Sequence, residues 1–310
     1  MNMNVLCLNG VSQIFSDNLS NNLLYGVIDF FKWATLEAGG FANISGTISG
    51  VYGGSRNQLR PVNDARYSSG RVWEGFRSNW IWESGINAIH KPDIYINNTL
   101  QPTNSGYYID YPNGRVIFNS GLNTRTNTIT ANFSYRTLDF KPINDNIIPD
   151  IFCGSYRTDS DFISTSGSRS QLSELKQQLP IIAVDVNPNK RYAPLQLGGG
   201  QWCYVDVIFY VLTENNSDAN NILDMISHQN DKTIWLINRD EVKKSGNYPY
   251  SLTYRGDVVE NPLQYPELVS THQWRTASFS ETRSYNYTNL PYNLRGGIVK
   301  TTFIIPMGNI

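Results

Sequence analysis

The residues best suited to chemistry are two carboxylates beside an aromatic run. Glu74 lies inside the segment Trp73–Trp82, which is rich in Trp and Phe, and Glu83 follows it directly. A glycoside hydrolase needs two carboxyl groups that face each other across a cleft. In a chain with 19 Tyr and 7 Trp, however, carboxylates fall beside aromatic residues by composition alone. We therefore expect no glycosidase site here.

Other catalytic and ligand-binding patterns fail on residue type or spacing. The three histidines are far apart in the sequence, and the three cysteines form no CxxC pair. The run Gly198–Gly200 is followed by a predicted strand, whereas a phosphate-binding loop leads into a helix. No Gly-x-Ser-x-Gly motif of the hydrolase type occurs. The sequence thus predicts no enzyme, with no catalytic residue, metal site or cofactor.

The aromatic run has a second interpretation as a carbohydrate-binding platform. Trp73–Trp82, together with Tyr107, Tyr108 and Tyr111, offers flat rings on which sugars stack. Trp and Tyr also dominate the centres of protein–protein contacts and occur in ordinary cores. The sequence is therefore compatible with sugar binding, with a protein–protein contact and with an ordinary core.

Composition suits a protein that buries its surface against neighbours, and equally a Tyr-rich all-β domain with a polar, uncharged surface. The 310 residues carry 25 Lys and Arg against 26 Asp and Glu, a net charge of −1, which argues against specific nucleic-acid binding. No run of roughly 18 apolar residues occurs, so we predict no membrane span. Only 16% of the residues are charged and 13% are aromatic. Interface cores show the same depletion of charge and enrichment in aromatic residues.

The first part of the chain, residues 1–145, is predicted to hold one helix and a small antiparallel β-sandwich. Apolar residues recur at helical spacing over residues 17–36, and Gly39-Gly40 ends the pattern. Asn113-Gly114 separates two β-like runs and predicts a hairpin with a type I′ turn. Residues 126–135 alternate between apolar and polar types, as a half-buried strand does.

Residues 146–310 are predicted to form an α/β domain with a mixed sheet and two helices. The helices are expected over 168–179, started by Ser168, and over 217–229, capped by Ser217. Strands are expected over 181–186, 201–212, 233–237 and 298–305, with a loop over 187–200. The strand 201–212 is apolar on both faces, so we expect a second layer or a neighbouring subunit to cover each face.

Two stretches of the chain resemble structural proteins of tailed bacteriophages. Ile94–Phe118 resembles a small β module of phage virion proteins, with the hairpin pattern I-D-Y-x-x-G-R-V-x-F. Leu179–Ile237, a β-loop-β-α-β arrangement, resembles tail-terminator and related neck proteins, whose α/β core forms hexameric rings. The resemblance implies an α+β fold and a non-enzymatic virion component that forms a ring in the neck or tail, as a terminator or connector. A carbohydrate- or receptor-binding tail-tip or baseplate protein is the alternative.

The resemblance also implies partners and contact residues. The partners would be further copies of the chain, in a hexamer, and adjacent neck or tail proteins, in a virion assembled in the bacterial cytoplasm. The loop from Arg191 to Gly200 would project, with Leu195 and Leu197 as apolar anchors and Gly198, Gly199 and Gly200 allowing close approach. The helix over 17–36 would lock against a neighbour through Phe30, Phe31 and Trp33.

Overall fold

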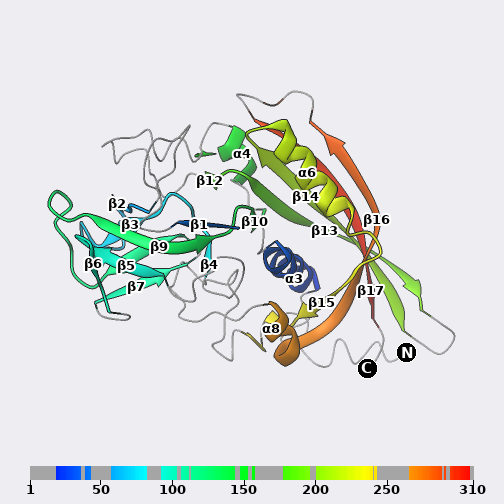
Figure 1. Cartoon of the computed structure of the whole chain (residues 1–310). Helices are drawn as coiled ribbons and strands as arrows, with labels where there is room; N and C mark the ends of the chain where they lie inside the picture. The colour runs from blue at the N-terminus through cyan, green and yellow to red at the C-terminus, as the bar shows by residue number, and fades with distance from the viewer. Residues whose placement is uncertain are drawn as a thin grey trace.

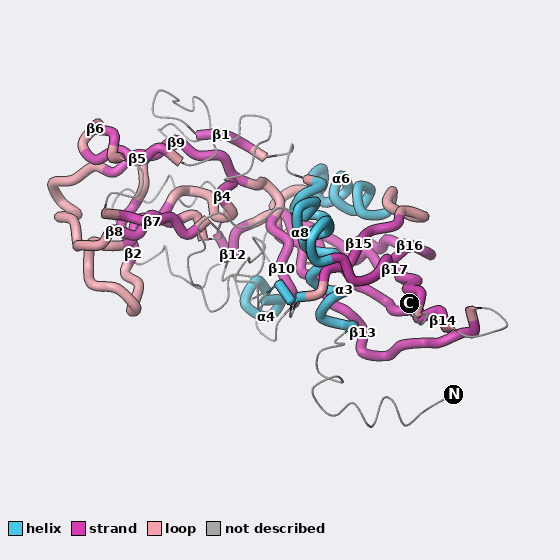
Figure 2. The backbone as a smooth tube through the Cα atoms, turned by 90° about the horizontal axis from the view of Figure 1, so that it is seen from below, coloured by secondary structure: helices cyan, strands magenta, loops and turns pink. Residues whose placement is uncertain are grey.

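The computed structural model (Figure 1) shows an α+β protein built mainly from sheets. It describes residues 19–35, 39–42, 57–81, 92–102, 106–111, 113–143, 147–152, 156–157, 177–195, 200–239, 241–242, 265–287, 290 and 294–307. Figure 2 places a small group of strands at one end of the molecule and a long sheet with its helices at the other.

The long sheet has six strands and is mixed. In spatial order they are β10 (Asp139–Pro142), β13 (Ile181–Pro194), β14 (Gln201–Thr213), β17 (Arg295–Pro306), β16 (Gln273–Asn286) and β15 (Thr233–Ile237). β10 pairs with β13 in parallel, and all the other pairs are antiparallel. The sheet curls, so that it has a concave and a convex face (Figure 1).

The helix α3 (Leu19–Ala34) fills the concave face, which confirms the helix predicted over 17–36. It contacts β10 and β13 at one edge of the sheet and β15 at the other. Phe31 stacks on Phe140 of β10 with ring centroids 5.2 Å apart, and meets Phe209 of β14 edge-on at 5.4 Å. A single helix thereby joins both edges of the curled sheet through one apolar core.

Two further helices complete the concave side. α6 (Asn216–Ser227) buries Ile222, Leu223 and Ile226 against β14, β16 and β17. Its cap is Asn215 rather than the predicted Ser217, because the Asn215 side chain accepts the backbone N–H of Asp218 at 2.8 Å. α8 (Tyr265–His272) packs on β15, β16 and α3.

The small group of strands forms the predicted antiparallel sandwich. One sheet contains β1 (Gly40–Ala42), β9 (Ile129–Tyr135), β5 (Asp93–Ile96), β6 (Thr99–Leu100) and β4 (Trp80–Ile81). The other contains β2 (Arg60–Val62), β3 (Val72–Glu74), β8 (Arg115–Phe118) and β7 (Tyr107–Asp110). Side chains of both sheets meet in one core, in which Trp80 stacks on Phe133 at 4.1 Å.

The hairpin predicted at Asn113-Gly114 exists, but its turn differs from the prediction. β7 and β8 are joined by four residues, and within the described part of this loop only Gly114 has a positive φ, 63°. A Cβ on Gly114 would lie 2.2 Å from the Arg77 carbonyl oxygen, so only glycine fits there. The two-residue turn with both φ values positive is Asn97-Asn98, between β5 and β6.

The packing does not follow the predicted division into 1–145 and 146–310. α3 and β10 belong to the first range, but both join the core of the six-stranded sheet. α3 is apolar on more than one side, and its apolar residues are buried in the core of the six-stranded sheet rather than in the small sandwich. The helix predicted over 168–179 lies largely outside the described residues, and its end is extended, as β12 (Gln177–Gln178) paired with β11 (Tyr156–Arg157). α4 (Ile147–Phe152) covers one end of the convex face.

Strand β13 is much longer than the predicted strand 181–186. It continues to Pro194 and pairs with β14 along its length, with a bulge between Val186 and Lys190. The bulge accommodates Pro188, which has no N–H to donate to a ladder. Most of the predicted loop over 187–200 is therefore one arm of a long hairpin.

The position of Phe31 between sheet strands gives a first prediction. We expect Phe31→Ala to lower the free energy of unfolding by about 3 to 5 kcal/mol, because it opens a cavity where α3 meets β10 and β14. Urea unfolding followed by circular dichroism measures the change. The control is Leu100→Ala in the sandwich, where the side chain is 53% exposed and the expected change is under about 0.5 kcal/mol. Equal effects of the two substitutions would contradict the central role of Phe31.

Candidate functional site

The predicted contact residues of the 187–200 segment lie at the free end of the β13–β14 hairpin. Arg191 is exposed and stands in strand β13 opposite Tyr204, with its guanidinium 5.7 Å from that ring. Leu195 donates its backbone N–H to the Gly200 carbonyl oxygen at 3.1 Å, and Gly200 has a φ of 86°. Leu197, Gly198 and Gly199 lie outside the described residues. In Figures 1 and 2 this end points away from the sandwich.

The predicted contact residues of α3 divide into two kinds. Phe30 and Phe31 are 3% and 1% exposed within the chain itself, so they present almost no surface to a neighbour. Their predicted interface role is not supported, because the sheet of the same chain covers them. Trp33 is 41% exposed, and its ring lies 5.9 Å from that of Tyr265. Of the three, Trp33 alone is available for contact.

The aromatic run at 73–81 is core, not a sugar platform. Trp73, Phe76 and Trp80 are at most 2% exposed, and Tyr107 and Tyr111 are also buried. The Nε1 atoms of Trp73 and Trp80 donate to the carbonyl oxygens of Gly70 and Arg77, so their polar edges are satisfied internally. Trp82 and Glu83 lie outside the described residues. Tyr108 is half-buried, and the other described rings of the predicted platform lie in the core.

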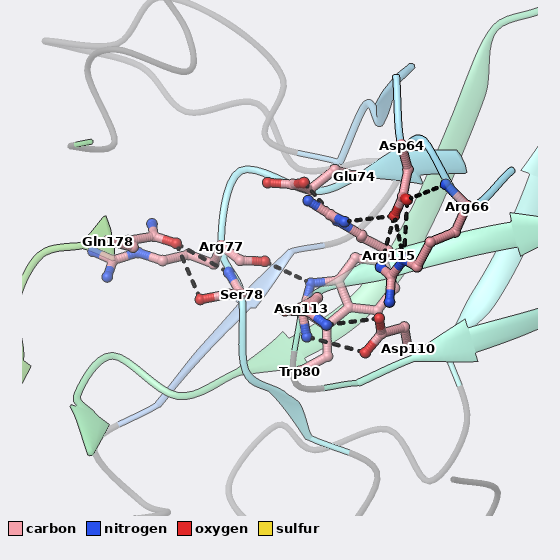
Figure 3. Close-up of polar contacts among 10 residues, drawn as sticks. All are labelled: Asp64, Arg66, Glu74, Arg77, Ser78, Trp80, Asp110, Asn113, Arg115 and Gln178. Carbon is pink, nitrogen blue, oxygen red and sulfur yellow. Dashed lines mark hydrogen bonds and ion pairs between the residues drawn. The ribbon is translucent and has the colours of Figure 1, made fainter. Parts of the chain in front are cut away.

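Glu74 belongs to a buried ion-pair cluster (Figure 3). Arg115 donates through Nε to a Glu74 oxygen at 2.8 Å and through Nη1 to an Asp64 oxygen at 3.3 Å. Arg66 donates through Nη2 to the same Asp64 oxygen at 2.7 Å. The hydrogen bonds from Arg66 lower the pKa of Asp64 from 3.8 to about 2, with a further contribution from Arg115. These carboxylates stabilise the fold and are not arranged as an acid and base across a cleft.

A row of side-chain contacts joins the sandwich to the six-stranded sheet (Figure 3). Gln178 accepts the backbone N–H of Ser78 at 3.0 Å and donates to the Phe76 carbonyl oxygen at 3.0 Å. Arg77 donates to the carbonyl oxygens of Thr137 and Leu179, at 3.3 and 3.2 Å. The loop before β4 and the segment before β13 are thus held side by side.

The convex face of the six-stranded sheet is rich in apolar and aromatic side chains. On β14 the alternation puts Cys203, Val205, Val207, Phe209 and Val211 on the concave side, each 0% exposed. The other side of the same strand carries Trp202, Tyr204, Ile208 and Tyr210, all half-buried, beside Ile298 and Ile304 of β17. Beyond α4, no described helix or strand covers this face.

More exposed aromatic residues extend this face toward its edge. Tyr285 of β16 is 56% exposed and pairs with Ile298, and Trp235 of β15 is 42% exposed. Polar side chains lie among them: Lys300 pairs with Asp206 at 2.9 Å, and the strand registers place Asp185, Arg191, Ser278 and Arg283 on the same face. We call the residues Trp202, Tyr204, Ile208, Tyr210, Trp235, Tyr285, Ile298 and Ile304 the convex patch. Its chemistry suits a protein partner.

A cavity of about 360 Å³ lies where β13 begins and β14 ends. Leu138, Ile222 and Met225 supply apolar walls, and Glu214 and Asp218 are exposed carboxylates among its lining residues. Arg77 and Leu179 bound it on the side of the sandwich. The sequence reasoning missed this cavity because its walls come from four separate stretches of the chain.

The described part of the chain contains no cluster of metal-binding side chains and no helix suited to span a membrane. No group of three or more His, Cys, Asp or Glu side chains stands close enough there to hold a metal ion. None of its helices combines the length and the apolar character needed to cross a bilayer. Burial raises the pKa of the Cys203 thiol, which disfavours the reactive thiolate.

Comparison with protein-family models, with curated proteins and with solved structures finds no match.

The pair of Asp64 with Arg66 gives a pH prediction. A carboxylate whose pKa is lower in the folded than in the unfolded chain stabilises the fold above about pH 4, and that contribution disappears as the pH falls toward 2. Asp64→Asn should therefore be less stable than the native chain at pH 7, and the difference should shrink between about pH 4 and 2. Urea unfolding at a series of pH values tests this. A difference independent of pH would contradict the assignment.

Removing the shared cation should have a larger effect. Arg115→Met would leave Glu74 and Asp64 in a buried site without Arg115, and we expect a loss of about 3 to 5 kcal/mol in the free energy of unfolding. The matched control is Arg125→Met, because Arg125 is exposed. A loss no greater than that of the control would mean that the cluster is solvated in solution.

Proposed function

We propose that the chain is a non-enzymatic structural component of a tailed-phage virion, and that it forms a ring in the neck or tail as a terminator or connector. The observation that carries the proposal is the convex patch: a long sheet that is fully packed on one face presents apolar and aromatic side chains on the other. Exposed Trp and Tyr side chains such as Trp235 and Tyr285 are typical of protein contacts, and a subunit contact would cover them.

Composition supports the same conclusion. Only 16% of the residues are charged, and charged side chains are depleted at the centres of protein contacts. Aromatic side chains, which make up 13% of the chain, are enriched there. The long hairpin adds a projecting element at one end of the sheet. A projecting element and an open face on the same subunit suit heterologous, head-to-tail contacts, which close into a ring when the rotation between subunits allows it.

Two alternative functions are a glycan-active enzyme and a sugar-binding tip protein. In the part of the chain that the structure describes, the residues expected to support them have other roles. A glycan-active enzyme would use Glu74, which is tied to Arg115 in a buried pair. A sugar-binding tip protein would use the aromatic rings of 73–81, which lie in the sandwich core. Neither function has a described site, whereas subunit contact has the convex patch.

The partners in this proposal are other copies of the chain and adjacent neck or tail proteins. The hexameric ring, and a place in the virion after assembly in the bacterial cytoplasm, rest on the resemblance to tail-terminator and neck proteins. A net charge of −1 fits a role without specific nucleic-acid contacts.

Self-association is the direct test. We expect light scattering of the purified chain to give the mass of a closed oligomer, six copies if the terminator resemblance holds, and negative-stain images to show rings. The double substitution Trp235→Ser with Tyr285→Ser should shift the mass toward the monomer, because it removes two exposed aromatic side chains of the convex patch.

The matched control is Leu100→Ser, which removes an equally exposed apolar side chain from the sandwich and should leave the mass unchanged. Circular dichroism establishes that all variants are folded. A native chain that remains monomeric at its highest soluble concentration would contradict the proposal.

A further inference from the structure

The turn between β7 and β8 contains an Asn-Gly pair, a sequence that can modify itself. The chain has this pair twice, at residues 9–10 and at Asn113-Gly114, and only the second pair lies within the described residues. The backbone nitrogen of the glycine can attack the side-chain carbonyl carbon of the asparagine, because no glycine side chain obstructs the approach.

The reaction consumes only water. When the Gly114 nitrogen bonds to the Cγ atom of Asn113, it loses its proton, and the side-chain nitrogen of Asn113 takes up a proton and leaves as ammonia. The bond closes a succinimide ring. Water then adds to either ring carbonyl carbon and opens the ring, which gives aspartate or isoaspartate at position 113.

The fold holds the reacting amide on Asp110 (Figure 3). The side-chain nitrogen of Asn113 donates to one Asp110 oxygen at 2.7 Å, and the backbone N–H of Asn113 donates to the other at 3.3 Å. Asp110 is only 1% exposed, so water competes little for its carboxylate. The Asn113 side chain is therefore not free to turn toward the Gly114 nitrogen.

The attacking nitrogen is held as well. The Gly114 N–H donates to the Tyr111 carbonyl oxygen at 3.2 Å, and the Gly114 carbonyl oxygen accepts the Gly75 N–H at 2.9 Å. Gly114 is buried and packs so closely that a Cβ would lie 2.2 Å from the Arg77 carbonyl oxygen. Its backbone cannot move to the Cγ atom of Asn113 unless the turn separates from residues 75–77.

We propose that Asn113 is a deamidation site that the native fold suppresses and that opening of the β7–β8 turn activates. The inference goes beyond the proposed function and holds whether or not the chain self-associates. The rate of modification follows the fraction of molecules in which the turn is open. The modified chains are then those in which the sandwich has opened.

The product does not fit the native turn. A carboxylate at position 113 stands against Asp110, whose pKa is already raised by burial, and the two like charges repel each other. Arg66 and Arg115 are the cations that act on Asp110, and both already donate to Asp64. Isoaspartate also adds a methylene group to the backbone next to the closely packed Gly114. Modification thus weakens the contacts that suppressed it.

Ageing of the native chain tests the proposal without any variant. Incubation at pH 7, digestion to peptides and mass spectrometry measure the conversion of Asn113 from amide to acid. We expect conversion in native buffer to be at least about tenfold slower than in urea, because the hydrogen bonds to Asp110 must first break. Asn9, in the other Asn-Gly pair, is the internal control in urea, where both pairs should convert at similar rates.

A variant that releases the amide should remove the protection. Asp110→Ala deletes both hydrogen bonds from Asn113, and conversion in native buffer should rise at least about tenfold, the effect of losing a hydrogen bond to a charged group. The matched control is Asp93→Ala, because Asp93 is exposed in the same sandwich and accepts from Asn132. Circular dichroism establishes that both variants are folded.

The effect of the product is measured with Asn113→Asp, with Asn113→Ser as the uncharged control. At pH 7 the folding equilibrium constant of the aspartate variant should be at least about tenfold lower than that of the serine variant. Repulsion raises the pKa of both carboxylates in the folded chain. The difference should therefore shrink as the pH falls below about 4 and the carboxylates become protonated.

The outcomes are distinct. Equal conversion of Asn113 in native buffer and in urea would overturn the proposed suppression. Conversion of Asn9 in urea without that of Asn113 would show that Asn113 is no modification site. An unchanged rate in Asp110→Ala would remove Asp110 from the explanation. Slow conversion in the native chain, with fast conversion in urea and in Asp110→Ala, would establish the site.

Discussion

The structure depends on the packing of one helix inside a curled sheet. α3 touches β10 and β15, which are the opposite edges of the six-stranded sheet, and its Phe31 contacts rings from β10 and β14 and, at 6.1 Å, Phe279 of β16. The helix supplies the apolar surface that both edges of the curled sheet bury. The close fit extends to Gly26, where a Cβ would lie 2.9 Å from a methyl carbon of Leu236.

In this arrangement the two faces of the sheet are covered to different extents. α3, α6 and α8 cover the concave face. The β14 side chains that point to this face are fully buried. The convex face is covered at one end by α4 and carries half-buried and exposed aromatic residues elsewhere. A long hairpin projects beyond the helices at one end, and a cavity lined by Arg77, Glu214 and Asp218 lies at the other. The sheet thus has one face that is packed within the chain and another that stays partly exposed.

The polar groups of the small sandwich show how composition can suggest chemistry that the fold does not provide. Glu74 lies beside aromatic residues, as in a sugar-binding enzyme, yet its oxygen accepts a hydrogen bond from Arg115, 41 positions away in the sequence. Asp64 is fixed by Arg66 and Arg115 in the same way. Burial raises the pKa of Asp110, and Asn113 holds its carboxylate in the turn between β7 and β8. These carboxylates are structural.

Local pattern alone determined the elements that bury one face. The helix over 17–36, the alternation along 201–212, the helix near 217–229 and the strand 233–237 all follow from the spacing of apolar residues, and all are present. Only the tertiary structure decided which elements belong together. α3 joins a sheet whose strands follow it by more than 100 residues, a partnership that depends on matching apolar areas and leaves no local signal. Residues 187–194 of the predicted loop are part of a strand because β14 supplies their hydrogen-bond partners, which outweigh the local preferences of Asn and Pro. The cavity required four stretches of chain to meet, so no single segment of the sequence indicated it.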